Sequence, residues 1–400
     1  MRTLSDTLTR LARLRDLQAP RPHAAAGRLT PLSGFGSNPG ALKAHVFVPD
    51  DLPAGAPLVV VLHGCTQTAA DYDHGSGWSR LAERHGFAVL YPEQQRANNP
   101  NLCFNWFQPG DIARDAGESL SIRQMVARIA ADHAIDPARI HVTGLSAGGA
   151  MASVMLAAYP EVFAGGAIVA GLAHGVARTI PEAFDRMRGH GMPAEAELQR
   201  LLRDAAEHDG PWPTVSIWQG SADMTVAPAN ADAVAAQWRG VHGVGRTPAR
   251  STTAGAHHHE AWSDAQGRVV VERHTIVGMG HGTPLDATGG DAVAGPFMLD
   301  VGIDSTARIA AFFGVDRPAT TKAAQPKPAR RRTASAAKPK PRVLEGEIML
   351  PEAPSAAFRD TARPERHGPA PQPREAPLHA TVSGIQKTIE DALRKAGLMR

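Results

Sequence analysis

The sequence predicts an α/β fold in which helices cover both faces of a mostly parallel central sheet. From residue 41 onward, short apolar runs alternate with longer stretches of helical periodicity. This alternation is typical of strands joined by crossover helices. The run Leu-Val-Val-Val-Leu at residues 58–62 is continuously apolar, which suits a strand buried on both faces of a parallel sheet.

Each expected strand is a short apolar run, and each expected helix is a longer stretch with helical periodicity. Strands are expected at residues 43–48, 58–63, 88–91, 140–143, 167–170, 215–218 and 269–276. Helices are expected where apolar residues recur at three- and four-residue steps, at residues 78–85, 119–133, 147–158, 229–239 and 305–313. Residues 181–208 form a helical insertion, which is either part of the wall of a cleft or a plain crossover connection.

The chain divides into four parts. Residues 41–315 are long enough for one large α/β domain. Residues 1–40 are expected to contain an amphipathic helix, packed on the domain in preference to binding a surface, followed by a linker. Residues 316–379 are rich in Ala, Pro, Lys and Arg and are expected to be disordered, because they can bury little apolar surface. Residues 380–400 are expected to close the chain with an amphipathic helix.

Charge and hydropathy exclude some partners. The net charge is +3, but residues 317–342 carry nine Lys and Arg and no acid, so removing those nine charges leaves −6 on the remainder. A basic tail does not predict nucleic-acid binding at an active site, although it could contact an anionic surface. No apolar run approaches the roughly 20 residues that span a bilayer. Charged residues interrupt the N-terminal leucines, so we expect no secretory signal and a cytoplasmic location.

The cysteines and clustered histidines do not predict a redox or metal site. Cys65 and Cys103 are too few for a disulfide scaffold, so reduced thiols are expected in the cytoplasm, with a single bridge as the alternative. His257, His258 and His259 precede Glu260. Adjacent residues on a strand point to opposite faces, so we expect no metal site from these consecutive residues.

Ser146 is the strongest candidate for a catalytic residue. Residues 144–148 read Gly-Leu-Ser-Ala-Gly, between a predicted strand and a predicted helix. G-x-S-x-G in this setting is typical of the nucleophile elbow of the α/β-hydrolase fold, where a tight turn strains the serine and only small neighbours let strand and helix pass closely. The alternative is a glycine-rich turn between strand and helix that has no catalytic role.

A catalytic serine needs a histidine to take its proton and a carboxylate to orient that histidine. In this fold the three follow in the order serine, acid, histidine. Asp223 and His281 each lie in a loop after a predicted strand, which is where catalytic side chains converge. Asp232, inside a predicted helix, and Asp264, in a hairpin turn, fit less well.

The backbone amides of Cys65 and Ala147 are the expected oxyanion hole. The fold takes one amide from the loop after an early strand and the other from the residue after the nucleophile. These groups together would catalyse acyl transfer through an acyl-enzyme, which requires no cofactor.

Five segments of the chain form a specific set of motifs: His-Gly-Cys-Thr-Gln at 63–67, Gly-Ser-Gly-Trp at 75–78, Tyr-Pro-Glu-Gln at 91–94, Cys-Phe-Asn-Trp-Phe at 103–107 and Gly-Leu-Ser-Ala-Gly-Gly-Ala-Met at 144–151. Together they resemble the polyhydroxybutyrate (PHB) depolymerase family of esterases, whose relatives include feruloyl and acetylxylan esterases. The resemblance covers about residues 41–315 and implies the same fold, triad and oxyanion hole. It also implies that Cys65 and Cys103 come together near the cleft, and it makes secretion the alternative to a cytoplasmic location.

The resemblance implies an esterase acting on 3-hydroxyalkanoate polymers or oligomers, with feruloyl or acetyl esters of plant polysaccharides as the alternative. His63, Gln67 and Trp106 are candidates for the substrate cleft, although Trp106 could equally be a buried core residue. An alternative interpretation is that the protein is not an enzyme but a binding protein, which coats a polymer granule or membrane surface through its terminal helices and basic tail. The intact triad argues against that as the main role, but those helices could hold an esterase on a granule.

Overall fold

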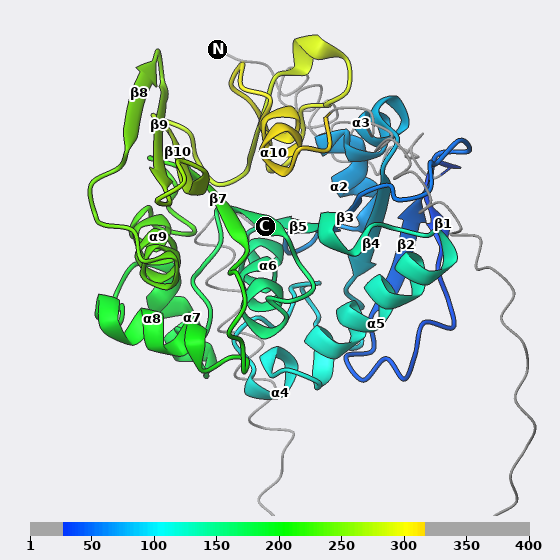
Figure 1. Ribbon diagram of the computed structural model, residues 1–400, viewed down its shortest axis with the longest axis horizontal. Helices are drawn as coiled ribbons and strands as arrows, with labels where there is room; N and C mark the ends of the chain where they lie inside the picture. The colour runs from blue at the N-terminus through cyan, green and yellow to red at the C-terminus, as the bar shows by residue number, and fades with distance from the viewer. Residues whose placement is uncertain (1–26, 317–400) are drawn as a thin grey trace, which may run out of the picture. The chain divides into compact units, whose positions relative to one another are not determined.

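The computed structural model describes residues 27–316, which form a ten-stranded sheet with helices on both faces (Figure 1). The N-terminal helix, the basic tail and the C-terminal helix expected from the sequence lie outside these residues. All seven predicted strands are present in the sheet.

The centre of the sheet is parallel and its two edges are antiparallel. The order of strands is β1 (Thr30–Pro31), β2 (Lys43–Phe47), β4 (Ala88–Glu93), β3 (Leu58–Leu62), β5 (Ile140–Leu145), β6 (Gly165–Val169), β7 (Thr214–Gly220), β10 (Val269–Ile276), β9 (His257–Ser263) and β8 (Arg250–Ala254). A second sheet pairs β11 (Thr283–Leu285) with β12 (Met298–Asp300) in parallel. The carboxyl ends of β3, β5, β7 and β10 therefore meet at one edge of the main sheet.

Two helical layers cover the sheet, and the helices predicted from periodicity are confirmed within a few residues. One layer contains α4 (Pro109–Ile112), α5 (Gly117–Asp132), α6 (Ala147–Ala158), α7 (Ile180–Met187), α8 (Glu195–Arg203) and α9 (Ala229–His242). The other contains α2 (Ala69–Ser76), α3 (Trp78–His85) and α10 (Ser305–Phe313). Short 3₁₀ turns occupy Pro137–Arg139 and Ala287–Gly289. No helix between residues 27 and 316 combines the length and apolar content needed to cross a membrane.

Strand β3 shows how the sheet separates two cores. Leu58, Val60 and Leu62 belong to the core that includes residues of α5, α6 and α9, whereas Val59 and Val61 belong to the core that includes residues of α2, α3 and α10. All five side chains are buried, so the continuous apolar run reflects burial on both faces, as predicted. The predicted insertion becomes α7 and α8, and α8 packs against α9, where Gln237 Nε2 donates to the carbonyl of Leu198.

Candidate active site

Ser146 occupies a sharp turn between β5 and α6. Its backbone angles are φ +57° and ψ −118°, a conformation that costs a non-glycine residue on the order of 1–3 kcal/mol and occurs mainly at functional sites. Its N–H donates to the carbonyl of Val169 on β6 at 2.9 Å. The strained turn that the sequence predicts at Ser146 is therefore present.

Glycines make this turn sterically feasible. A Cβ at Gly144 would lie 2.4 Å from the carbonyl oxygen of Gly148, and a Cβ at Gly148 would lie 2.3 Å from the carbonyl oxygen of Leu62. A Cβ at Gly149 would lie 2.8 Å from the carbonyl oxygen of Val169. These neighbours are backbone atoms that cannot move aside, so only glycine fits where α6 crosses β3, β5 and β6.

Asp223 and His281 are hydrogen-bonded to each other. Asp223 lies in the turn after β7, and His281 lies in the loop after the adjacent parallel strand β10. Nδ1 of His281 donates to Oδ2 of Asp223 at 2.7 Å, and the Asp223 side chain is fully buried. The two loops are also joined through the backbone, where the N–H of Ala222 donates to the carbonyl of Met279 at 3.0 Å.

The remaining acceptor sites of Asp223 are filled by donors. Its Oδ1 accepts the backbone N–H groups of Thr225 and Val226 at 2.8 and 2.9 Å. Its Oδ2 also accepts the Nε2 donor of Gln219 at 3.1 Å. A carboxylate is an acceptor-only group, so this ring of donors holds one side-chain orientation toward His281.

The competing acids are engaged elsewhere. Asp232 lies on α9 and pairs with Arg273. Asp264 caps the hairpin between β9 and β10, where its Oδ1 accepts the N–H groups of Gln266 and Arg268. Neither is hydrogen-bonded to His281, so the positional preference for Asp223 agrees with the geometry.

Backbone hydrogen bonds link the strand ends that carry Ser146, Asp223 and His281. The links run from Ser146 N–H to Val169 O, from Ala170 N–H to Trp218 O and from Ser221 N–H to Ile276 O, at 2.9, 2.8 and 3.0 Å. They join the ends of β5, β6, β7 and β10 in the order of the sheet. Ser146 and the His281–Asp223 pair therefore lie along the same edge.

Cys65 and Ala147, the expected oxyanion donors, follow the adjacent strands β3 and β5. Within residues 27–316, neither backbone N–H has a hydrogen-bond acceptor. The loop around Cys65 is fixed on both sides, because Gly64 N–H donates to Oε1 of Gln67 at 2.9 Å and Thr66 N–H donates to the carbonyl of Asn101 at 2.7 Å. Two free donors on neighbouring strand ends can serve a developing oxyanion.

Cys65 and Cys103 form a disulfide, so the expectation of reduced thiols is wrong and the alternative of a single bridge is correct. Their Cα atoms are 4.3 Å apart. The physical reason is topological: Cys65 follows β3 and Cys103 follows β4, and these neighbouring parallel strands end at the same edge. The bridge ties the loop of Cys65 to the segment before α4.

His63 supports this loop from inside the protein. Only 1% of the residue is exposed. Its Nε2 accepts the backbone N–H of Gln94 at 3.1 Å, so Nδ1 carries the proton and donates to the carbonyl of Gly64 at 2.8 Å. Burial lowers the pKa of His63, which keeps the ring neutral. Proposed from sequence as a cleft residue, His63 instead positions the backbone beside Cys65.

The other two cleft candidates are also largely buried. Gln67 uses its side chain to hold Gly64, as described above. Trp106 is 7% exposed and packs edge to face against Phe107, with ring centroids 5.3 Å apart. Trp106 is therefore a buried core residue in this structure, which was the alternative to a place in the cleft.

Glu118 is a buried carboxyl group that sequence reasoning missed. It lies in the first turn of α5, and its Oε1 accepts hydrogen bonds from the side-chain amides of Gln94 and Asn98 at 2.6 and 3.2 Å. Its Oε2 accepts the N–H of Asn105 at 2.8 Å, while Gln94 also donates to the carbonyl of Cys103. Burial raises the pKa of Glu118 to about 8, against the opposing effect of these donors. An acid in the first turn of a helix gave no sign of this burial in the sequence.

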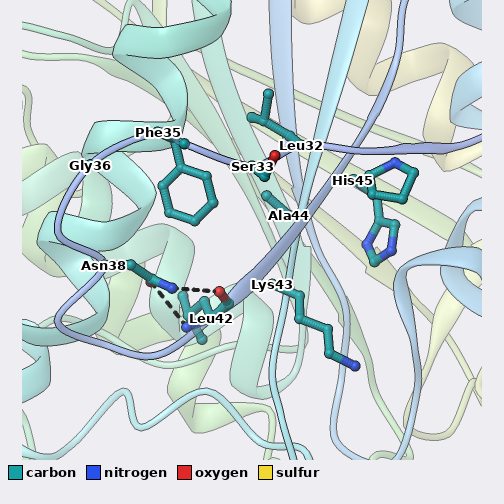
Figure 2. A pocket seen from close by; sticks show the side chains of 11 residues that line it. Leu32, Ser33, Phe35, Gly36, Asn38, Leu42, Lys43, Ala44 and His45 are labelled. Carbon is teal, nitrogen blue, oxygen red and sulfur yellow. Dashed lines mark hydrogen bonds between the residues drawn. The ribbon is translucent and has the colours of Figure 1, made fainter.

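A separate hollow lies at the edge of the sheet formed by β1 and β2, and Figure 2 shows its lining. Its volume is about 370 Å³, and residues 31–36, 38 and 42–45 line it. Asn38 closes one side through hydrogen bonds with Leu42. Strands β4 and β3 separate it from β5, and neither Ser146 nor the His281–Asp223 pair lines it, so it is not part of the candidate active site.

Comparisons with known proteins agree on the family. Residues 45–262 match the model of a family described as esterase PHB depolymerase. A poly(3-hydroxyalkanoate) depolymerase C of Paucimonas lemoignei is 50% identical over 291 residues, covering 72% of this chain and 70% of the relative. An acetylxylan esterase of Coprinopsis cinerea is 31% identical over 276 residues, covering 67% and 73%. The solved structure of an acetyl xylan esterase from Aspergillus awamori has a TM-score of 0.63 at 24% identity, covering 72% of this chain and all of that one, which supports the predicted α/β-hydrolase fold.

Proposed function

The chain belongs to the esterase PHB depolymerase family, and on that premise we propose that it hydrolyses 3-hydroxyalkanoate polymers or oligomers with Ser146 as nucleophile. Membership makes it a carboxylic ester hydrolase. One observation carries the proposed mechanism: the 2.7 Å hydrogen bond between His281 and Asp223 lies at the sheet edge where Ser146 stands on its strained turn.

The first half of the reaction forms an acyl-enzyme. Oγ of Ser146 attacks the ester carbonyl while Nε2 of His281 takes the hydroxyl proton. Asp223 stabilises the resulting imidazolium through the hydrogen bond at Nδ1. His281 then gives this proton to the departing alkoxide, so the alcohol leaves and the acyl group stays on the serine.

The second half returns the free enzyme. Water attacks the acyl-enzyme with His281 as base, and the acid product leaves as Ser146 regains its proton. In both halves the N–H groups of Cys65 and Ala147 donate to the oxyanion. One such donor contributes about 2.7–4 kcal/mol to transition-state stabilisation, and the Cys65–Cys103 bridge holds the first of them in place.

Exposed apolar side chains beside the His281–Asp223 pair support a polymer substrate. Met224 follows Asp223 directly and is 91% exposed, and Val277, in the loop before His281, is 60% exposed. The two loops are joined, because Gly278 N–H donates to Oγ of Ser221 at 2.9 Å. Apolar groups at the rim of a site gain free energy when they contact an apolar polyester surface.

A second candidate is the removal of acetyl groups from xylan. The observation that favours it is the 31% identity to the acetylxylan esterase of Coprinopsis cinerea. The 50% identity to the depolymerase of Paucimonas lemoignei is higher, so the polyester remains the first choice.

The disulfide supports action in an oxidising compartment, which favours the secreted alternative over the cytoplasm. Association with a polymer granule through residues 1–40 and 380–400 stays a prediction, because those segments lie outside the described residues except for 27–40.

The proposal is tested with wild-type protein on four substrates: 3-hydroxybutyrate oligomers, amorphous poly(3-hydroxybutyrate), acetylated xylan and methyl ferulate. The expected result is a higher kcat/KM on the oligomers and faster release of acid from the polymer than from xylan. Preference for acetylated xylan or methyl ferulate would move the assignment to carbohydrate esters. Failure to hydrolyse any of the four would contradict the esterase assignment.

A further inference from the structure

A second group of titratable side chains lies on strands β7, β9 and β10, on the face of the sheet that α10 covers. His274 pairs with Trp218 on β7 and with His259 on β9. Because side chains alternate along a strand, this register places one set on the same face: Ser216, Trp218, His257, His259, Glu272 and His274. His258 belongs to the opposite face, where its Nδ1 lies 2.9 Å from Oγ1 of Thr253.

We propose that His259, Glu272 and His274 bind a transition-metal ion, for which Zn²⁺ is the best match. Nε2 of His259 lies 3.1 Å from Oε2 of Glu272, and Nε2 of His274 lies 3.0 Å from Oε1. One ligand atom from each residue lies within 4.8 Å of the others. Zinc bonds of about 2.0–2.1 Å in a tetrahedron separate ligand atoms by roughly 3.3 Å, so the three groups need only small shifts.

An unsatisfied nitrogen points to a missing partner. Nε2 of His274 is buried and makes no well-aligned hydrogen bond, although Oε1 of Glu272 is near. Its Nδ1 lies 2.8 Å from Nε2 of His257. When Nδ1 donates its proton to His257, Nε2 presents a lone pair toward the carboxylate, and a cation between the two would satisfy both groups.

The surroundings of His274 resemble those of a metal-bound imidazole. Metal-ligating histidines usually donate their second ring N–H to a neighbouring acceptor, which fixes the tautomer, and His257 provides that acceptor. The indole of Trp218 stacks on the ring of His274 with centroids 3.8 Å apart and fixes its plane. Ser216 donates to Oε1 of Glu272 at 2.7 Å and orients the carboxylate.

The competing explanation is a polar cluster that joins three strands through hydrogen bonds alone. It accounts for the contacts of His259 and Ser216 with Glu272, but it leaves Nε2 of His274 with only a poorly aligned contact to Oε1 of Glu272 at 3.0 Å. The positive charge of Arg308 acts on His257 and His274 and opposes a cation. The charge of Glu272 is needed to offset it, so removal of that charge should weaken binding.

The ion would clamp β9 to β10, the strand that leads into the loop of His281. It takes no part in the proposed acyl transfer, because Ser146, Asp223 and His281 are not among its ligands. The sequence directed attention to the consecutive residues His257 to His259, whereas this site needs one of them together with two residues of the neighbouring strand. Only the register between β9 and β10 reveals the combination.

The test uses the full chain without a polyhistidine tag, stripped of metal with a chelator. Isothermal titration with ZnCl₂ is expected to show one strong site per chain, and Co²⁺ is expected to give the intense visible absorption of a tetrahedral complex. His259→Ala and Glu272→Gln should weaken Zn²⁺ binding at least ten-fold, while His258→Ala on the opposite face should bind like wild type. Hydrolysis of a soluble ester shows whether each variant is folded.

Absence of a strong site in the wild type, or an octahedral Co²⁺ spectrum, overturns the proposal without reference to any variant. Unchanged Zn²⁺ affinity in folded His259→Ala overturns it as well, as does an equal loss in His258→Ala. A Tm that rises with Zn²⁺ in wild type and His258→Ala but not in Glu272→Gln supports it, because an ion that binds only the folded state stabilises that state.

Discussion

Gln219 donates a 3.1 Å hydrogen bond to Oδ2 of Asp223, the same oxygen that accepts from His281 at 2.7 Å. The amide of Gln219 also donates to the carbonyl of Val226 at 3.0 Å, which fixes its own position. Gln219 is therefore a positioning residue that acts on His281 through Asp223, and this role can be measured.

We expect Gln219→Leu to lower kcat by roughly ten-fold with little change in KM, because a hydrogen bond to a charged group contributes about 1.5–3 kcal/mol. The loss should fall on kcat, since Gln219 does not contact the substrate in the proposed mechanism. Steady-state kinetics on a soluble ester provide the measurement. Gln199→Leu, which removes an amide bonded to the carbonyl of Ala236 on the helical layer, is the matched control, and an equal fall in both variants would reject the positioning role.

The Cys65–Cys103 bridge should contribute to both stability and activity. Cys103→Ser is expected to lower the free energy of unfolding by about 2–4 kcal/mol, as loss of a native disulfide generally does. It should also reduce kcat, because the loop that carries the N–H of Cys65 is less constrained. Urea unfolding and kinetics are measured with and without dithiothreitol: the reductant should affect the wild type and leave Cys103→Ser unchanged. Wild-type activity that is insensitive to complete reduction would disprove the link to catalysis.

Glu118 should make stability depend on pH. Its pKa rises from the usual 4.5 to about 8 in the folded protein, so between these values the folded state holds a proton that the unfolded chain has released. The contribution of this group to the free energy of unfolding therefore falls as pH rises through that window. Urea unfolding measures the free energy of unfolding of wild type and Glu118→Gln at several pH values from 5 to 8, which cover this range. The comparison isolates the contribution of Glu118. The wild type should lose stability relative to Glu118→Gln as the pH rises toward 8, and a constant difference between the two would show that Glu118 does not titrate there.

The exposed rim should matter for polymer and not for small esters. Met224→Ser is expected to slow hydrolysis of an amorphous polyester film about three- to ten-fold, because burial of a methionine side chain contributes on the order of 1.5–3 kcal/mol and contact at a rim recovers only part of it. Hydrolysis of a soluble short-chain ester by the same variant serves as the internal control and should stay within two-fold. Equal losses on both substrates would place Met224 in the chemistry rather than at the polymer surface.

The sequence was informative wherever one local pattern determined the structure. Leu58–Leu62 and the Gly-Leu-Ser-Ala-Gly turn at residues 144–148 were correctly placed, because burial on two faces requires an apolar run and a tight turn requires glycine. The pairing of Asp223 with His281 was predicted from the order of residues after strands, which parallel topology then brings to one edge.

Features that depend on contacts between distant segments escaped prediction. Strand β8 is exposed along its whole length and has no apolar pattern to mark it. The burial of His63 and Glu118 depends on how the loops after β3 and β4 pack at their common edge. The meeting of Cys65 with Cys103 depends on the same packing, and only the family resemblance implied it. No local spacing encodes such contacts.

The central claim is that Ser146 carries the acyl group. A fluorophosphonate inhibitor reacts with activated serines, and peptide mass spectrometry locates the adduct. We predict one adduct per wild-type chain, on Ser146, with loss of activity in proportion to labelling, and neither adduct nor activity in folded Ser146→Ala. An adduct on another residue, or ester hydrolysis that persists in Ser146→Ala, would contradict the account.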